Sequence, residues 1–171
     1  MSGEPAFWRG FLTRVRGLLD GGPLSDDAFA NLARHFGEPS SWATYPDVLP
    51  TLDALTAGGL PLAIVSNWDS QLPRLLELRG LARYFRTVSV SAIEETGKPG
   101  AEIFRRTCER LGVEAGEALH VGDSLRDDYD GARAAGLRAV LLDRRGEHGH
   151  VADRIASLSE LAPRLLGAST G

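Results

Sequence analysis

Four short apolar segments, each followed by a helical stretch, constrain the fold of this chain more than any other feature. The segments span residues 60–66, 86–91, 118–122 and 138–143. Short apolar or β-branched runs of this kind form strands, often buried on both faces of a sheet. Strands that alternate with helices build a parallel sheet covered by helices on both sides. The sequence therefore predicts an α/β fold with a three-layer α/β/α Rossmann-like parallel sheet.

Helices are predicted before, between and after these strands. Their apolar side chains recur at helical spacing, and Pro or Gly stands where several of them begin or end. Pro99, for example, opens one helix and Gly136 closes another. The predicted helices span residues 46–57, 71–81, 99–113, 127–136 and 156–166.

The charge and composition of the chain exclude several classes of partner. The 171 residues carry a net charge of −4 without a basic stripe, so we do not expect a nucleic-acid partner. No apolar run reaches the ~18 residues of a membrane span, so we expect no membrane partner. Cys108 is the only cysteine, which rules out an intramolecular disulfide and favours a reducing, cytoplasmic setting. The sequence does not indicate an oligomeric state.

Polar side chains follow three of the four predicted strands. Ser66 and Asn67 come after the first strand, Lys98 follows the second, and Asp123 follows the third, with Asp127, Asp128 and Asp130 close behind. Ligands of parallel sheets bind at the carboxyl ends of the strands, so these groups should meet at one edge. Lys98 is the only lysine beside eighteen arginines, which makes its place on this edge notable.

Each of these groups has a functional and an ordinary structural interpretation. Carboxylates such as Asp123 suit Mg²⁺, but an acidic first helical turn also occurs without a metal. Ser66 could hold a phosphoryl group or only cap a helix. Lys98 offers a compact ammonium for a tight anionic pocket, although it could be an exposed lysine in a turn.

Taken together, "VSN", "GKP" and "VGDS" with the following "DD" resemble the haloacid dehalogenase-like hydrolase superfamily over residues 46–166. Its members are mostly Mg²⁺-dependent phosphatases, with a minority of dehalogenases, and the flanking segments resemble its small capped phosphatases. The resemblance implies that Ser66 hydrogen-bonds the phosphoryl group and that Asn67 shapes its pocket. It implies that Lys98 neutralises charge on nucleophile and substrate, so that Ser66 and Lys98 are catalytic.

The resemblance also implies a metal site. Asp123 would ligate Mg²⁺, and Asp128 would support the metal shell or orient Lys98, with Asp127 as the alternative for that role. The substrate would be a small phosphorylated metabolite whose identity the sequence does not reveal. Phosphatase and dehalogenase activity both stay open, although the residue set favours phosphate.

The N-terminal part of the chain resembles part of a helical cap. We therefore expect a partial cap over residues 1–45 and the α/β core over residues 46–171. Ser25 is predicted to cap a helix there, and Trp8, Phe11 and Val15 are spaced as the packing face of another.

One motif of the resemblance is missing. Family members carry a nucleophilic aspartate and an acid/base aspartate in a D-x-D motif after their first strand. No apolar strand followed by D-x-D precedes residue 46. We therefore expect a sheet without its central strand between 60–66 and 118–122, and a truncated, marginally stable chain that is inactive without this motif.

Three functions are compatible with these features. The first is a Mg²⁺-dependent phosphatase whose nucleophile is absent from these residues. The second is a non-catalytic binding or regulatory relative that keeps the phosphate cradle. The third is a receiver-like phosphoacceptor domain, although its acidic pair should stand near the N-terminus. His120 is expected to have a structural role only.

Overall fold

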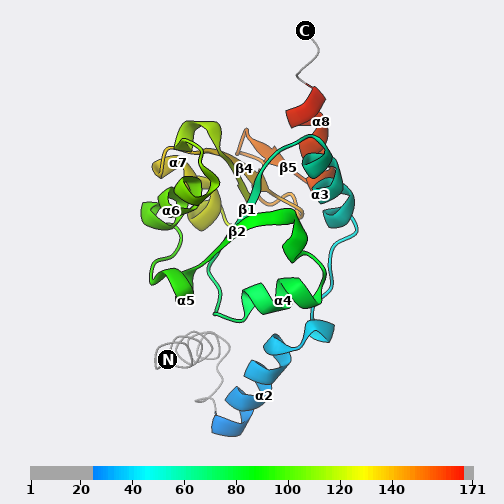
Figure 1. Ribbon diagram of the computed structural model, residues 1–171, viewed down its shortest axis with the longest axis vertical. Helices are drawn as coiled ribbons and strands as arrows, with labels where there is room; N and C mark the ends of the chain where they lie inside the picture. Colours follow the sequence, from blue (N-terminus) through cyan, green and yellow to red (C-terminus); the bar gives the residue numbers. More distant parts are fainter. Residues whose placement is uncertain (1–24, 168–171) are drawn as a thin grey trace.

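The computed structural model describes residues 25–167, and its strands form two parallel sheets (Figure 1). All the neighbouring strands run parallel, and each of the four predicted strands is confirmed within two residues at its ends. A two-residue fifth strand was not predicted. The first sheet contains β1 (Leu62–Ser66) and β2 (Phe85–Val90); the second contains β3 (Leu119–Gly122), β4 (Arg138–Leu142) and β5 (Arg154–Ile155).

The two sheets share no backbone ladder. β1 pairs only with β2, and β3 pairs only with β4, so no described strand bridges β1 and β3. This is the position where the sequence analysis expects a strand to be missing. The edges of both strands that turn away from their partners therefore keep backbone N–H and C=O groups outside any described ladder.

Helices cover the sheets on two sides, as predicted (Figure 1). α6 and α7 lie on one side, where Ile103 and Phe104 are fully buried and pack with Val65 of β1 and Ala139 of β4. α3 and α8 lie together on the other side. The α-helices are α2 (Asp26–Gly37), α3 (Val48–Ala57), α4 (Leu72–Leu78), α5 (Ser91–Glu94), α6 (Ala101–Leu111), α7 (Gly131–Ala134) and α8 (Leu161–Leu166).

Several predicted helices are shorter than expected. The helix predicted over 71–81 ends at Leu78, because Gly80 adopts a left-handed conformation with φ of +69°. The helix predicted over 127–136 is instead a π-helical turn (Leu125–Asp130) followed by α7. A π-turn breaks the 3.6-residue period, so periodicity places its boundaries poorly. Short 3₁₀ turns span Pro39–Ser41, Ala82–Tyr84, Ala115–Glu117 and Leu158–Glu160.

The helix predicted to start after Ser25 is α2. The Ser25 hydroxyl accepts a hydrogen bond from the Ala28 N–H at 3.2 Å, which satisfies an otherwise unpaired donor at the helix start. α2 lies below α4 in Figure 1 and joins the core through residues 38–47. The predicted helix face of Trp8, Phe11 and Val15 falls outside the described residues.

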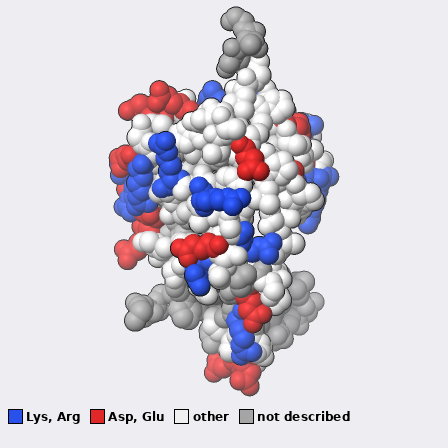
Figure 2. Space-filling view, turned by 45° about the vertical axis from the view of Figure 1, so that its right-hand side comes forward, with Lys and Arg blue, Asp and Glu red and all other residues white. Residues whose placement is uncertain are grey.

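Charged side chains of both signs are mixed on the face of the molecule shown in Figure 2. Within residues 25–167, every helix is too short or too polar to cross a lipid bilayer.

Candidate active site

The centre of the candidate site is a buried ion pair between Lys98 and Asp128. The Lys98 Nζ lies 2.5 Å from Asp128 Oδ1, and the two side chains are only 12% and 5% exposed. The sequence thus brings its single lysine onto one of the four predicted aspartates. Because a buried charge is costly without a partner, each of these groups needs the other to stay ionised inside the protein.

Asp128 is held by more than Lys98. His120 Nε2 lies 2.8 Å from the same carboxylate oxygen, and the Ser124 N–H donates to the second oxygen at 3.0 Å. Burial raises the pKa of Asp128, but the His120 hydrogen bond, the Lys98 charge and the Ser124 N–H outweigh it and hold that pKa well below its usual range. Asp128 is therefore an anion that anchors Lys98.

The local chain explains how Asp128 can reach this position. A Cβ on Gly122 would lie 2.2 Å from the Asp128 Cγ, so only glycine fits at the end of β3. His120, two residues earlier, packs its ring edge-on against Phe104 with centroids 5.1 Å apart. The π-helical turn then carries Asp128 back over the strand end.

Asn67 joins the end of β1 to the Lys98 loop. Its Nδ2 donates to the Lys98 C=O at 2.8 Å, and its Oδ1 accepts from the Lys98 N–H at 2.8 Å. A Cβ on Gly97 would lie 2.7 Å from this Oδ1, which explains the glycine before Lys98. The Asn67 amide is thus occupied with the Lys98 backbone, and its effect on a phosphate pocket would be through the position of Lys98.

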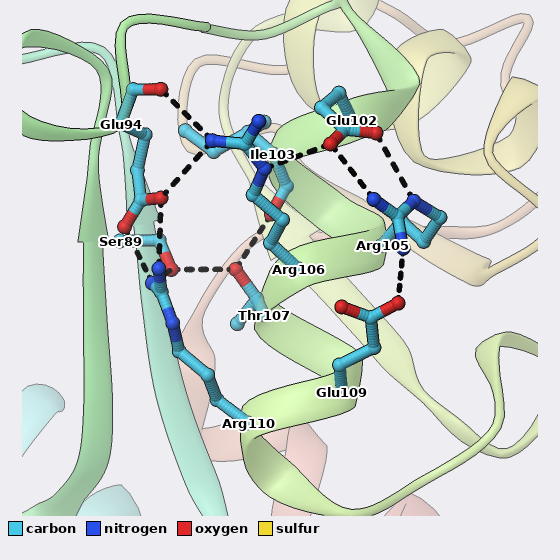
Figure 3. Close-up of polar contacts among 9 residues, drawn as sticks. All are labelled: Ser89, Glu94, Glu102, Ile103, Arg105, Arg106, Thr107, Glu109 and Arg110. Atoms are coloured by element: carbon cyan, nitrogen blue, oxygen red, sulfur yellow. Dashed lines mark hydrogen bonds and ion pairs between the residues drawn. The ribbon is translucent and has the colours of Figure 1, made fainter.

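A second polar cluster fixes the start of the Lys98 loop (Figure 3). Glu94, whose side chain is 7% exposed, forms ion pairs with both Arg110 and Arg106. Arg106 also donates to the Glu94 C=O at 3.0 Å, and Arg110 to the Ser89 hydroxyl at 3.1 Å. The Arg110 hydrogen bond lowers the pKa of Glu94 against the opposing effect of burial. α6 thereby holds the segment that leads to Lys98.

Asp123 is the best-placed ligand for a cation. It is exposed at the end of β3, and its carboxylate makes no hydrogen bond or ion pair with the described residues. Mg²⁺ commonly takes one or two carboxylates and completes its shell with water and phosphate oxygens, so Asp123 fits that role. Among residues 25–167, however, no three acidic, His or Cys side chains gather as a ready metal site.

The other predicted site residues lie close by in the chain. Ser66 is the last residue of β1, opposite Val90, and Asp127 begins the π-helical turn with its N–H donating to the Ser124 hydroxyl at 3.1 Å. Asp128 already has three donors, which suits the orientation of Lys98 better than direct ligation of a metal. The structure thus connects Asn67, Lys98 and Asp128 by direct contacts, with Ser66 and Asp123 as chain neighbours of this cluster.

Sequence reasoning missed an ion pair behind Asp123. Asp47, at the start of α3, accepts two hydrogen bonds from Arg144 at 2.8 and 3.0 Å, together with one from the Ser157 hydroxyl and one from the Leu158 N–H. Asp47 raises the pKa of Arg144, and the charge of Asp123 adds to this effect. These groups are 97 to 111 positions apart, so no local pattern links them.

Sequence reasoning also missed the role of His120 in the site. Its position in a strand, two residues before the glycine that admits Asp128, is the signal that could have revealed it.

Comparison with known proteins gives this arrangement a family. The haloacid dehalogenase-like hydrolase profile matches residues 1–136. The chain is 36% identical to haloacid dehalogenase-like hydrolase domain-containing protein 3 of Danio rerio, over 83% of this chain and 61% of that protein. It is 36% identical to a phosphoserine phosphatase of Thermus thermophilus, over 81% of this chain and 57% of that protein.

Solved structures agree. A phosphatase of this family from Thermococcus onnurineus superimposes with a TM-score of 0.72 at 38% identity, covering 89% of this chain and 68% of that one. The chain spans about three fifths of the length of the two relatives named above. The profile match, the relatives and the parallel α/β fold lead to one conclusion: this chain belongs to the haloacid dehalogenase-like hydrolase family.

Proposed function

We propose that this chain forms the phosphate-binding and metal-supporting part of a Mg²⁺-dependent phosphatase for a small phosphorylated metabolite. The observation that carries the proposal is the Lys98–Asp128 ion pair, which is buried at the carboxyl ends of the strands and tied to Asn67. A relative named as a phosphoserine phosphatase supports the choice of phosphate over halide. The lone, buried Cys108 suits a reducing, cytoplasmic setting.

Each residue then has a definite task. Ser66 donates its hydroxyl to a phosphoryl oxygen at the end of β1. Lys98, held by Asp128 and by the Asn67 amide, places its ammonium against the charge of the phosphoryl group. Asp123 holds the metal, which when bound would neutralise phosphoryl charge. An aspartate nucleophile would attack phosphorus as the leaving oxygen takes up a proton, and water would then release phosphate from the acyl phosphate.

The split between the two sheets supports a place for that nucleophile. Ser66 and Asp123 stand at the ends of β1 and β3, the two strands that share no ladder. A strand between them would carry its own final residues to the same edge. We propose that the nucleophilic aspartate reaches the site in this way, on a segment that lies outside residues 46–166.

Phosphate binding at Lys98 is the first test. Because Lys98 is the only lysine, reductive ¹³C-methylation labels its Nζ together with the terminal amine and keeps the positive charge. We expect inorganic phosphate with Mg²⁺ to shift the Lys98 methyl resonance. Asp123→Asn should weaken the Mg²⁺-dependent part of the response, while the exposed control Asp130→Asn should not. A Lys98 resonance that ignores millimolar phosphate contradicts the proposal.

Hydrolysis is tested separately, on the product of the gene as its native host makes it. We expect Mg²⁺-dependent release of phosphate from p-nitrophenyl phosphate. Lys98→Arg should lower the rate by at least ~100-fold, because the wider guanidinium cannot replace the ammonium in a buried site.

A non-catalytic phosphate-binding protein is the second candidate. The absence of a D-x-D motif after an apolar strand within the first 45 residues favours it. The two candidates separate on one pair of measurements: the binding protein shifts the Lys98 resonance with phosphate but releases none from the ester.

A further inference from the structure

An apolar pocket of about 360 Å³ opens beside the candidate phosphate site. It lies between β1, α4 and the segment that joins α2 to α3. Its volume falls within the range of ~300–1,000 Å³ that is typical of small-molecule pockets. Its wall includes Trp42, Tyr45, Ile64, Ser66, Trp68 and Leu75.

Ser66 connects the pocket to the phosphate site. Side chains two residues apart on a strand share a face, so Ile64 and Ser66 lie on the same side of β1. Val65 lies on the opposite side and packs into the core with α6. A phosphoryl group bound at Ser66 would therefore have its ester oxygen next to the apolar wall.

The aromatic part of that wall is held in place. Trp42 and Trp68 pack edge to face, with ring centroids 4.8 Å apart. The Trp68 backbone is fixed by the Ser91 hydroxyl, which accepts from its N–H and donates to its C=O, both at 3.2 Å. The Arg144 guanidinium stacks over the Tyr45 ring at 4.2 Å while it binds Asp47.

The charge of the lining limits what the pocket can bind. No carboxylate belongs to its described lining, and its one charged residue there, Arg79, donates to the Thr44 hydroxyl at 3.1 Å. An amino group of a substrate would find no counter-ion, and it would lose its hydration without compensation. A flat apolar group would instead gain contact with the rings and with Ile64.

We infer that the pocket receives the organic part of the substrate, and that this part is an aromatic or other flat apolar alcohol esterified to phosphate. The inference rests on the proposed function, because it takes Ser66 and Lys98 as the phosphate site. It adds the class of leaving group, which neither the fold nor the site geometry assigns.

The test compares methyl phosphate with 1-naphthyl phosphate on the intact 171-residue chain with Mg²⁺. Two probes report on two places: the ¹³C-methyl resonance of Lys98 reports on phosphate, and tryptophan fluorescence reports on the pocket. We expect both esters to shift the Lys98 resonance, 1-naphthyl phosphate to bind at least ten-fold more tightly, and only the naphthyl ester to change the fluorescence.

A variant locates the effect. Ala43 is exposed and lines the pocket, so Ala43→Phe should narrow its mouth without disturbing the core. We expect this variant to bind 1-naphthyl phosphate no more tightly than methyl phosphate and to leave methyl phosphate binding unchanged. Ala57→Phe, at an exposed position outside the pocket, is the matched control and should keep the ten-fold preference.

The outcomes that overturn the inference are distinct from failure of the phosphate site. Equal affinity of the two esters, or a naphthyl preference that survives Ala43→Phe, overturns the aromatic pocket while the phosphate site stands. Binding of 1-naphthol as tight as that of its phosphate overturns the coupling between pocket and phosphate. A Lys98 resonance that neither ester shifts overturns the proposed function, and the inference with it.

Discussion

Removal of the Asp47 carboxylate should destabilise the fold by about 3 kcal/mol. Asp47→Ala leaves the Arg144 guanidinium, the Ser157 hydroxyl and the Leu158 N–H without their shared acceptor. Loss of one partner of a buried ion pair costs about 3–5 kcal/mol. The lower end applies here, because the Arg144 side chain is 23% exposed and water can solvate it in part.

Urea unfolding followed by circular dichroism measures this loss. A change of about 3 kcal/mol corresponds to a fall in Tm of about 6–12 °C for a chain of this size. Asp130→Ala is the matched control, since Asp130 is exposed and should change stability by less than about 0.5 kcal/mol. If Asp47→Ala unfolds within 0.5 kcal/mol of the unaltered chain, the Asp47–Arg144 contact is not the anchor that the geometry describes.

The same carboxylate predicts a pH dependence. The Arg144 hydrogen bonds outweigh burial and, with Ser157 and Leu158, hold the pKa of Asp47 in the folded state below its usual range. In the unfolded chain this pKa is about 3.9. The folded state therefore gains its full stabilisation above about pH 4–5, and loses it as the pH falls through the lower folded-state pKa. The stability gap between the unaltered chain and Asp47→Asn should be constant near neutral pH and shrink in acid. A gap that widens in acid would reverse the assigned sign.

Two further substitutions probe how Lys98 is positioned. Gly122→Ala should displace Asp128 and destabilise the fold by at least ~2 kcal/mol, whereas Gly116→Ala, where a Cβ meets nothing within 4 Å, should be nearly neutral in the same unfolding assay. Glu94→Gln should cost about 1–3 kcal/mol and change the ¹³C-methyl resonance of Lys98, because both arginine ion pairs of α6 lose their charge partner. Glu95→Gln, at the exposed neighbouring position, is its control, and equal effects of the two changes would contradict the anchoring role of Glu94.

The sequence alone predicted the parts of this protein that depend on local pattern. The parallel strands follow from apolar runs, and the meeting of Asn67, Lys98 and the aspartate cluster follows from the rule that parallel strands end at one edge. The division of labour among those residues did not follow. Asp128 and Asn67 carry contacts to Lys98 that depend on the left-out Cβ atoms of Gly122 and Gly97, and distances of this kind are not written in spacing.

Long-range pairs were beyond sequence reasoning for a different reason. Asp47 and Arg144 are each ordinary charged residues in their own segments, and only the packing of α3 beside the end of β4 makes them partners. His120 reads as one more residue of a strand until the turn after Gly122 returns Asp128 to it. The π-helical turn that does so has a period that amphipathic patterns do not report.

The separation of the two ladders has a consequence for how the protein opens. Because β1–β2 and β3–β4–β5 share no backbone hydrogen bond, what joins them in the core is side-chain packing, chiefly Ile103 and Phe104 of α6 against Val65 on one side and Ala139 on the other. Each ladder can then break as a unit of its own. Amide hydrogens of the two ladders should exchange with deuterium at two separate rates, and weaker packing around Phe104 should pull those rates further apart.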